Sequence, residues 1–273
     1  MAAIEELFDV RGARVVVTGA ASGLGLAMAE VMADAGARVT LADLDPESLE
    51  TETTRLADAG GQVRSFQVDV SDREQVQALI DDVVAEQGGV DVLYANAGIS
   101  LEPGFTDPKG GIGAIEPGTW ERVVGVNLNG VVFTMGAAAE VMKGQGAGKI
   151  VVTASNAGLK VEPLVGYSYA ATKAAVVHVV RQAAVELAPH GVNVNAIAPG
   201  PFRTRIGGGE LPNERIERIW SELIPLGRMA ETDELKGLVL MLGSPAASFI
   251  TGAVVLIDGG AMPSSFRDEI SRG

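Results

Sequence analysis

Short runs of β-branched residues alternate with longer stretches rich in Ala, Leu and Glu along most of the chain. The first run, residues 14–18, reads Arg-Val-Val-Val-Thr and lacks any alternation of apolar and polar positions. Such a run is typical of a central strand in a parallel sheet that helices cover on both faces. The repeated strand–helix order predicts an α/β fold: a single Rossmann-like, doubly wound domain whose mostly parallel sheet has about seven strands.

The same pattern gives the expected element boundaries. Strands are predicted over residues 14–18, 38–42, 62–68, 91–95, 149–153, 192–197 and 254–257. Helices are predicted over 26–34, 46–59, 72–86, 119–142, 167–188, 214–222 and 231–242. Segments rich in Gly or Pro predict loops over 99–118 and 201–213.

The charge balance excludes several kinds of partner. The chain has 35 acidic and 21 basic side chains, which argues against nucleic acid and anionic membrane surfaces, since both need a basic face. It has no Cys and two His, so no disulfide, Fe–S cluster or other metal site is expected. Residues 1–6 lack the features of a signal peptide, and no apolar run reaches the length of a membrane span. A cytoplasmic protein is therefore expected.

Three glycines stand directly between the first strand and the first helix, as Gly19-x-x-x-Gly23-x-Gly25. Glycines there allow a tight turn, close approach of a pyrophosphate and close packing of helix on strand. The amides and dipole of the helix N-terminus then face negative charge. We expect a dinucleotide site made by Gly19, Ser22, Gly23, Leu24 and Gly25; a flexible turn without a ligand is the alternative.

Asp43 follows the second strand, where an acidic side chain can accept hydrogen bonds from the adenosine ribose. It would also repel a 2′-phosphate, and neither Ser22 nor Leu44 offers a positive charge to hold one. The cofactor is therefore predicted to be NAD rather than NADP. Alternatively, Asp43 caps the next helix, a role that Asp45 fills better.

Two further strand ends are predicted to meet the cofactor. Asp69 and Val70 follow the third strand, and Asn96 and Gly98 follow the fourth. The carboxyl ends of parallel strands line the ligand crevice, and Gly98 lets the backbone pass close to the cofactor. The alternatives are a helix-capping role for Asp69 and a simple turn after Asn96.

Tyr169 and Lys173 are four residues apart in the predicted helix 167–188 and so share one face. A nearby ammonium favours the phenolate, which makes tyrosine a usable acid/base near neutral pH. The alternative is a half-exposed face with a snorkelling lysine. Ser155 ends the fifth strand, where its hydroxyl can bind a substrate oxygen or merely form a turn. Asn127, disfavoured in mid-helix, is expected to hold a water or to bend the helix.

Together these segments resemble the short-chain dehydrogenase/reductase family, in its single-domain branch, over essentially the whole chain. The matching segments are Thr18-Gly19-x-x-x-Gly23-x-Gly25, Asp69-Val70, Asn96-Ala97-Gly98, Asn127, Ser155, Tyr169-x-x-x-Lys173, Pro199-Gly200-x-x-x-Thr204 and Asp258-Gly259-Gly260.

The resemblance implies a catalytic tetrad of Asn127, Ser155, Tyr169 and Lys173. In the family, the tyrosine exchanges a proton with the substrate oxygen and the serine positions that oxygen. The lysine lowers the tyrosine pKa and, with the tyrosine, contacts the cofactor; the asparagine holds a water. The resemblance also implies nicotinamide contacts from Pro199, Gly200, Phe202 and Thr204, and a homotetramer paired through helices 119–142 and 167–188.

Two features depart from the family pattern. Ser155 precedes Tyr169 by 14 residues, where 13 or fewer is more common, and Asn156 falls at the shorter spacing. Ser155 is retained because its chemistry fits and Gly158 completes a Ser-x-x-Gly pattern. The loop 99–118 is also longer than usual and is expected to shape the substrate entrance or a subunit contact.

These inferences predict an enzyme that interconverts a secondary alcohol and a ketone with NAD, using residues 1–273 as one dinucleotide-binding and catalytic domain. Residues 201–225 are expected to form a substrate lid. Arg203 and Arg205 there are either solvated or available to a substrate anion. Two alternatives are an NADPH-linked ketoreductase of acyl chains and a non-catalytic NAD-binding scaffold or sensor. Apolar lid residues suggest an apolar small-molecule substrate body: Phe202, Ile206, Leu211, Ile219, Trp220 and Leu223.

Overall fold

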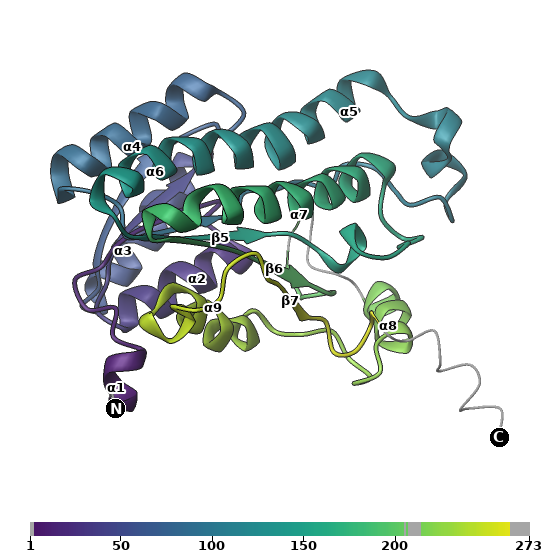
Figure 1. Cartoon of the computed structure of the whole chain (residues 1–273). Helices are drawn as coiled ribbons and strands as arrows, with labels where there is room; N and C mark the ends of the chain where they lie inside the picture. Colours follow the sequence, from purple (N-terminus) through teal and green to yellow (C-terminus); the bar gives the residue numbers. More distant parts are fainter. Residues whose placement is uncertain (1–2, 205, 207–213, 263–273) are drawn as a thin grey trace.

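The computed structural model describes residues 3–204, 206 and 214–262. Its centre is a seven-stranded sheet in the order β3-β2-β1-β4-β5-β6-β7 (Figure 1). Every pairing is parallel, so the expected mostly parallel sheet is in fact all parallel. Each predicted strand is present, with its ends within two residues of the expected ones. The strands are β1 Arg14–Thr18, β2 Arg38–Asp43, β3 Gln62–Gln67, β4 Val92–Ala95, β5 Gly148–Thr153, β6 Val192–Pro199 and β7 Val254–Ile257.

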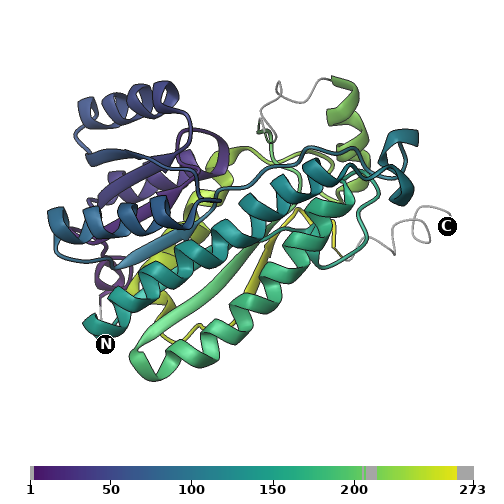
Figure 2. The ribbon, with the colours of Figure 1, turned by 90° about the horizontal axis from the view of Figure 1, so that it is seen from above.

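Helices cover both faces of this sheet (Figures 1 and 2). Alternate strand residues point to opposite faces, so Val15 and Val17 pack in one core with α2, α3 and α9, while Val16 packs in another with α4, α6 and α7. Both cores consist mainly of buried apolar side chains, which explains why the strands read as apolar runs. The helices are α1 Ile4–Leu7, α2 Gly23–Asp34, α3 Pro46–Asp58, α4 Arg73–Gln87, α5 Pro117–Val124, α6 Val131–Gln145, α7 Tyr167–Leu187, α8 Glu214–Leu223 and α9 Lys236–Gly243.

Three helical regions differ from the prediction. Helix α2 begins at Gly23 rather than residue 26, so the last two glycines of the turn belong to its first turn. The region 231–242 is a 3₁₀ turn, Thr232–Leu235, followed by α9. The loop 99–118 contains two short 3₁₀ turns, Pro108–Gly110 and Ile112–Ala114.

The predicted helix 119–142 is longer than expected. It runs from Pro117 to Gln145 and contains a π-helical turn, Gly125–Gly130, between α5 and α6. By length and composition alone this helix is apolar enough to cross a membrane, contrary to the expectation that no segment is. Packing explains its composition, because Met135, Ala138 and Met142 are buried against the sheet.

The strand order reverses at β1, which lies between β2 and β4. A crevice forms at such a switch point, outside the carboxyl ends of the strands. The glycine turn after β1 and the Asn96–Gly98 segment after β4 both lie there. The topology thus places the predicted cofactor residues at a single edge of the sheet.

Candidate active site

A cavity of about 1060 Å³ lies along the carboxyl ends of the central strands. Gly25 and Asn127 are the two predicted site residues that do not line it. The predicted residues on its wall are Gly19, Ser22, Gly23, Leu24, Asp43, Asp69, Val70, Asn96, Gly98, Ser155, Tyr169, Lys173, Pro199, Gly200, Phe202 and Thr204.

The glycine turn has the geometry that a pyrophosphate needs. Gly19 and Gly23 have φ values of 66° and 56°, in the left-handed region that favours glycine. A Cβ on Gly25 would lie 2.0 Å from the carbonyl oxygen of Gly19, so Gly25 lets α2 pack directly on the turn. Ser22, the N-cap of α2, makes no side-chain capping bond, and Gly23 and Leu24 face the cavity. These residues therefore fit the phosphates of a dinucleotide.

Asp43 stands at the wall beside this turn. Its Oδ2 accepts a hydrogen bond from the amide of Ala21 at 2.9 Å, which ties the end of β2 to the glycine turn. The alternative role, capping α3, belongs to Asp45, whose Oδ1 accepts from the amides of Glu47 and Ser48. Asp43 is therefore not the α3 cap.

Asp69 and Val70 follow β3 and lie in the cavity wall. Asp69 Oδ1 accepts from the amide and the hydroxyl of Ser71, at 2.9 and 2.7 Å, and so shapes its own turn. The cap of α4 is Asp72, not Asp69. Val70 lines the cavity beside Asp69.

Asn96 fixes three strand ends relative to one another. Its Nδ2 donates to the carbonyls of Thr18 and Gly19, and its Oδ1 accepts from the hydroxyl of Thr153 at 2.9 Å. A Cβ on Gly98 would lie 3.4 Å from both Asn127 Oδ1 and Lys173 Nζ. The β4 end thus connects the phosphate region with the predicted reactive residues.

Tyr169, Ser155 and Lys173 meet at the other end of the cavity. Tyr169 and Ser155 both line the cavity there, and Ser155 is close enough to affect the ionisation of the Tyr169 phenol. Lys173 lies one helical turn after Tyr169, with its Nζ 5.7 Å from the ring centroid, and donates to the carbonyl of Thr153 at 2.6 Å. Ser155 Oγ also accepts from the amide of Ala157 at 3.1 Å, which fixes its orientation. Lys173 is 2% exposed, so it does not snorkel to solvent.

Burial governs the protonation of this pair. It raises the pKa of the Tyr169 phenol, and the nearby Ser155 hydroxyl offsets only part of that rise. It lowers the pKa of Lys173 to about 8. The expected net lowering of the Tyr169 pKa is therefore wrong for the chain alone, because desolvation of the phenolate is the larger effect.

Asn127 lies behind the cavity, fully buried in the π-helical turn. Its Oδ1 accepts from the amide of Ile99, and its Nδ2 donates to the carbonyl of Ile99, each at 2.8 Å. The helix is π-helical rather than α-helical at Asn127. Both the amide and the carbonyl of Ile99 are therefore hydrogen-bonded to Asn127, which anchors the start of the loop 99–118.

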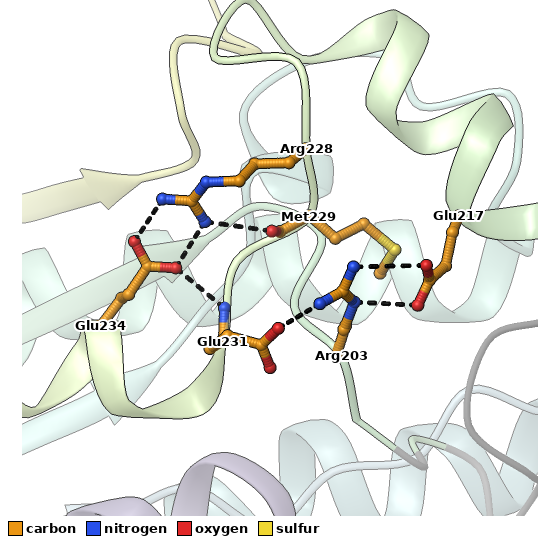
Figure 3. Close-up of polar contacts among 6 residues, drawn as sticks. All are labelled: Arg203, Glu217, Arg228, Met229, Glu231 and Glu234. Atoms are coloured by element: carbon orange, nitrogen blue, oxygen red, sulfur yellow. Dashed lines mark hydrogen bonds and ion pairs between the residues drawn. The ribbon is translucent and has the colours of Figure 1, made fainter. Parts of the chain in front are cut away.

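A cluster of ion pairs joins residues before, within and after α8 (Figure 3). Arg203 pairs with Glu217 on α8 through two contacts, one of them 2.8 Å, and also pairs with Glu231. Arg228 pairs with Glu234, which also accepts from the amide of Glu231. Arg203 is therefore engaged by two carboxylates rather than presented to a substrate anion, and Arg205 lies outside the described residues.

Of the apolar residues that the sequence assigned to a lid, only some line the cavity. Phe202, Ile206 and Trp220 do so, while Ile219 and Leu223 do not; Leu211 is outside the described residues. Arg122, Glu162 and Met229 also line the cavity and were not predicted. Glu162 falls in the irregular segment between Ser155 and α7, where no periodic pattern indicates which residues face inward.

The comparisons with known proteins agree with this geometry. Residues 19–262 match the family model described as "Enoyl-(Acyl carrier protein) reductase". The chain is 38% identical over 245 residues to cis-4-hydroxycyclohexanecarboxylate dehydrogenase of Sinomonas cyclohexanicum, covering 90% of this chain and 94% of the relative. It is 36% identical over 257 residues to galactitol 2-dehydrogenase of Agrobacterium fabrum, covering 90% and 95%.

A solved structure matches equally well. It is a short-chain type dehydrogenase/reductase from Mycobacterium marinum, with a TM-score of 0.87 and 36% identity over 95% of this chain and 99% of that one. Fold, cavity and relatives together define an oxidoreductase of the kind that uses NAD or NADP. The chain belongs to the short-chain dehydrogenase/reductase family.

Proposed function

We propose that the protein reversibly oxidises a secondary alcohol to a ketone with NAD⁺, releasing NADH and one proton. The observation that carries this proposal is the meeting of Tyr169, Ser155 and Lys173 at one end of a cavity whose other end is the glycine turn. Two similar proteins are named as dehydrogenases of hydroxylated compounds, which supports the same reaction class here.

Each residue has a role that follows from its position. Tyr169 accepts the proton of the substrate hydroxyl, while Ser155 holds the substrate oxygen by a hydrogen bond that strengthens as negative charge develops. Lys173, when charged, favours the phenolate of Tyr169 and contacts the cofactor ribose. Asn127 keeps Ile99 in place and holds a water behind Lys173. The nicotinamide supplies the acceptor for the hydrogen on the alcohol carbon.

The preference for NAD⁺ rests on Asp43. Its carboxylate lines the cavity beside the glycine turn, and the neighbouring wall residues Ser22, Leu44 and Ser48 carry no positive charge. A 2′-phosphate would face Asp43 without a compensating cation from these neighbours. Asp69 and Val70 are proposed to contact the adenine, and Gly98, Pro199, Gly200, Phe202 and Thr204 to line the nicotinamide site.

We propose one domain over residues 1–273, a lid around 201–225, and a cytoplasmic location. A homotetramer paired through the helices 119–142 and 167–188 is supported by exposed apolar side chains on α6 and α7, Val132 at 41% and Val185 at 78%.

The test is a kinetic comparison. The absorbance of NADH or NADPH is followed over a panel of secondary alcohols with NAD⁺ and with NADP⁺, using wild type and Asp43→Ser. We expect turnover with a higher kcat/KM for NAD⁺, and a smaller ratio in Asp43→Ser. A wild-type preference for NADP⁺ would favour the NADPH-linked ketoreductase, while NADH binding without turnover on any alcohol would favour the scaffold.

A further inference from the structure

Thr153 is a polar residue of the cavity wall to which the proposed chemistry gives no role. It is the last residue of β5, it is 8% exposed, and it comes two residues before Ser155. A β-branched side chain is common in a strand, so the position alone says nothing about function. Its hydroxyl and its backbone carbonyl, however, each bind a residue from a different part of the chain.

The carbonyl of Thr153 holds the ammonium of Lys173. Pairing of β5 with β4 ends at Val152, which faces Ala95, so this carbonyl lies just beyond the ladder. It accepts from Lys173 Nζ at 2.6 Å and is the one hydrogen-bond partner of Nζ among the residues that the structure describes. A buried ammonium depends on such an acceptor, because water does not solvate it. The position of the Thr153 peptide therefore sets the position of the Lys173 charge.

The hydroxyl of Thr153 ties the same peptide to the glycine turn. It donates to Asn96 Oδ1 at 2.9 Å, and the described part of the chain offers Oδ1 no other donor. The nitrogen of that side-chain amide donates to the carbonyls of Thr18 and Gly19, at 3.0 and 3.2 Å. Because β4 lies between β1 and β5, this one amide connects three neighbouring strand ends.

These hydrogen bonds form a continuous chain from the phosphate region to the ammonium. It runs from the Gly19 carbonyl through Asn96 to the Thr153 hydroxyl, and through the Thr153 peptide to Lys173 Nζ. Without that hydroxyl, Asn96 Oδ1 is an acceptor without a donor, which costs free energy and favours rotation of the amide. Pairing of β5 with β6 is not affected, so the strand stays in the sheet while its end loses the connection to the glycine turn.

We propose that Thr153 is a positioning residue: its hydroxyl, through Asn96, fixes the carbonyl that holds Lys173 where the ammonium reaches both Tyr169 and the cofactor ribose. This inference rests on the proposed function, which gives Lys173 those two contacts. Thr153 acts through Lys173 and takes no part in the transfer of the proton or the hydride. A small displacement of a group that acts on the reacting atoms lowers the rate strongly, so the hydroxyl should matter for turnover.

The test separates the hydroxyl of Thr153 from its carbon atoms. Thr153→Ser and Thr153→Ala lose the same methyl group and differ only in the hydroxyl, while Thr153→Val keeps the shape without the hydroxyl. Thr40→Val is the matched control. Thr40 is fully buried in β2 and its hydroxyl accepts from Gln87 Nε2 at 2.9 Å, but it does not line the cavity.

Three quantities are measured for each variant: kcat with the best alcohol of the panel above, the Kd of NADH, and the Kd of ADP, which lacks the nicotinamide and its ribose. Thr153→Ala and Thr153→Val should lower kcat about 10-fold and raise the Kd of NADH about 3- to 10-fold. The Kd of ADP should stay within about 2-fold, because ADP does not reach Lys173. Thr153→Ser should keep all three values within about 3-fold of wild type.

The control and the folded state are checked in the same series. Thr40→Val should lower Tm about as much as Thr153→Val does, and leave kcat and both Kd values within about 2-fold of wild type. Far-UV circular dichroism verifies that each variant is folded. If Thr153→Val does not fold, the comparison of Thr153→Ser with Thr153→Ala decides the question.

Three results would overturn the inference: equal kcat and NADH affinity in Thr153→Ser and Thr153→Ala, a loss of ADP affinity as large as the loss of NADH affinity, or an equal fall in kcat for Thr40→Val. The first would show that the hydroxyl has no effect, and the other two would indicate general destabilisation. If wild type oxidises no alcohol of the panel, the proposed function is wrong. The NADH and ADP affinities then still decide whether the Thr153 hydroxyl positions Lys173.

Discussion

The carboxylate of Glu102 caps the helix that carries Tyr169. Its Oε2 accepts from the hydroxyl of Ser168 at 2.6 Å and from the amide of Ser168 at 3.3 Å. Gly166, the N-cap of α7, has no side chain to do this, so a residue from the loop 99–118 does it instead. The same loop packs tightly on the segment before α7, since a Cβ on Gly104 would lie 2.0 Å from the carbonyl oxygen of Pro163.

Removing this cap should lower both stability and turnover. A lost capping interaction costs about 1 kcal/mol, so Glu102→Ala should lower Tm by about 2–4 °C. Because Tyr169 is in the first turn of α7, kcat should also fall several-fold. Glu116→Ala is the control, since Glu116 is the N-cap of α5 but makes no side-chain capping bond. Equal effects of the two substitutions on Tm and kcat would contradict the capping role.

Gly25 should not tolerate even one added methyl group. Its Cβ would overlap the Gly19 carbonyl at 2.0 Å, so Gly25→Ala must displace α2 from the turn. We expect weaker NADH binding, by about 10-fold or more, and a lower Tm. Gly136→Ala makes the same change in α6, where a Cβ meets nothing within 4 Å, and should instead raise Tm slightly. Thermal unfolding and NADH fluorescence titration check both variants.

Arg203 is expected to hold α8 in position at the cavity and to contribute little to the stability of the fold. Exposed ion pairs contribute little to folding, so Arg203→Met should change Tm by at most a few degrees. It frees α8, which carries Trp220 at the cavity wall, and should raise substrate KM several-fold. Arg228→Met removes a comparable pair that does not reach α8 and should leave KM nearly unchanged. Steady-state kinetics on both variants test this prediction. A rise in KM for Arg228→Met as large as that for Arg203→Met would contradict the role of Arg203 in holding α8.

The buried lysine gives stability a pH dependence of predictable sign. The pKa of Lys173 is lowered to about 8 in the folded chain and is about 10.4 when unfolded, so between these values the unfolded chain binds more protons. Stability without cofactor should therefore rise from pH 7.5 to 9.5 through Lys173, by on the order of 1–2 kcal/mol. The raised pKa of Tyr169 acts in the opposite direction, but only above about pH 10.

Urea unfolding at the two pH values measures this effect. Lys173→Met should lose most of the rise that wild type shows. Burial also lowers the pKa of Lys149, so Lys149→Met is measured in parallel. It should lose only the part of the rise in stability that Lys149 contributes. An unchanged pH dependence in Lys173→Met would contradict the assignment.

Local sequence signals predicted the elements well, and most residues that they assigned to the cofactor line one cavity. Buried strands read as apolar runs because both faces are covered, and the glycine turn has a spacing that few other structures require. Asp43 and Asp45 could be distinguished because helix capping depends on position relative to the helix start.

Contacts between distant segments could not be read from the sequence. Nothing in the pattern pairs Glu102 with Ser168 or indicates that Glu162 faces the cavity, because both side chains are placed by irregular segments. The direction of the Tyr169 pKa depends on how deeply the fold buries the phenol, which the Tyr-x-x-x-Lys spacing does not encode. The Asn127 side chain in the π-helical turn likewise binds Ile99, 28 residues earlier.

The most direct measurement is the kinetics of Tyr169→Phe beside its NADH affinity. The phenol hydroxyl is the single group removed, so kcat for alcohol oxidation should fall by at least about 100-fold. The Kd for NADH should stay within about 3-fold of wild type, because the glycine turn is untouched. Turnover near the wild-type rate in this variant would contradict the proposal that the Tyr169 oxygen exchanges the substrate proton.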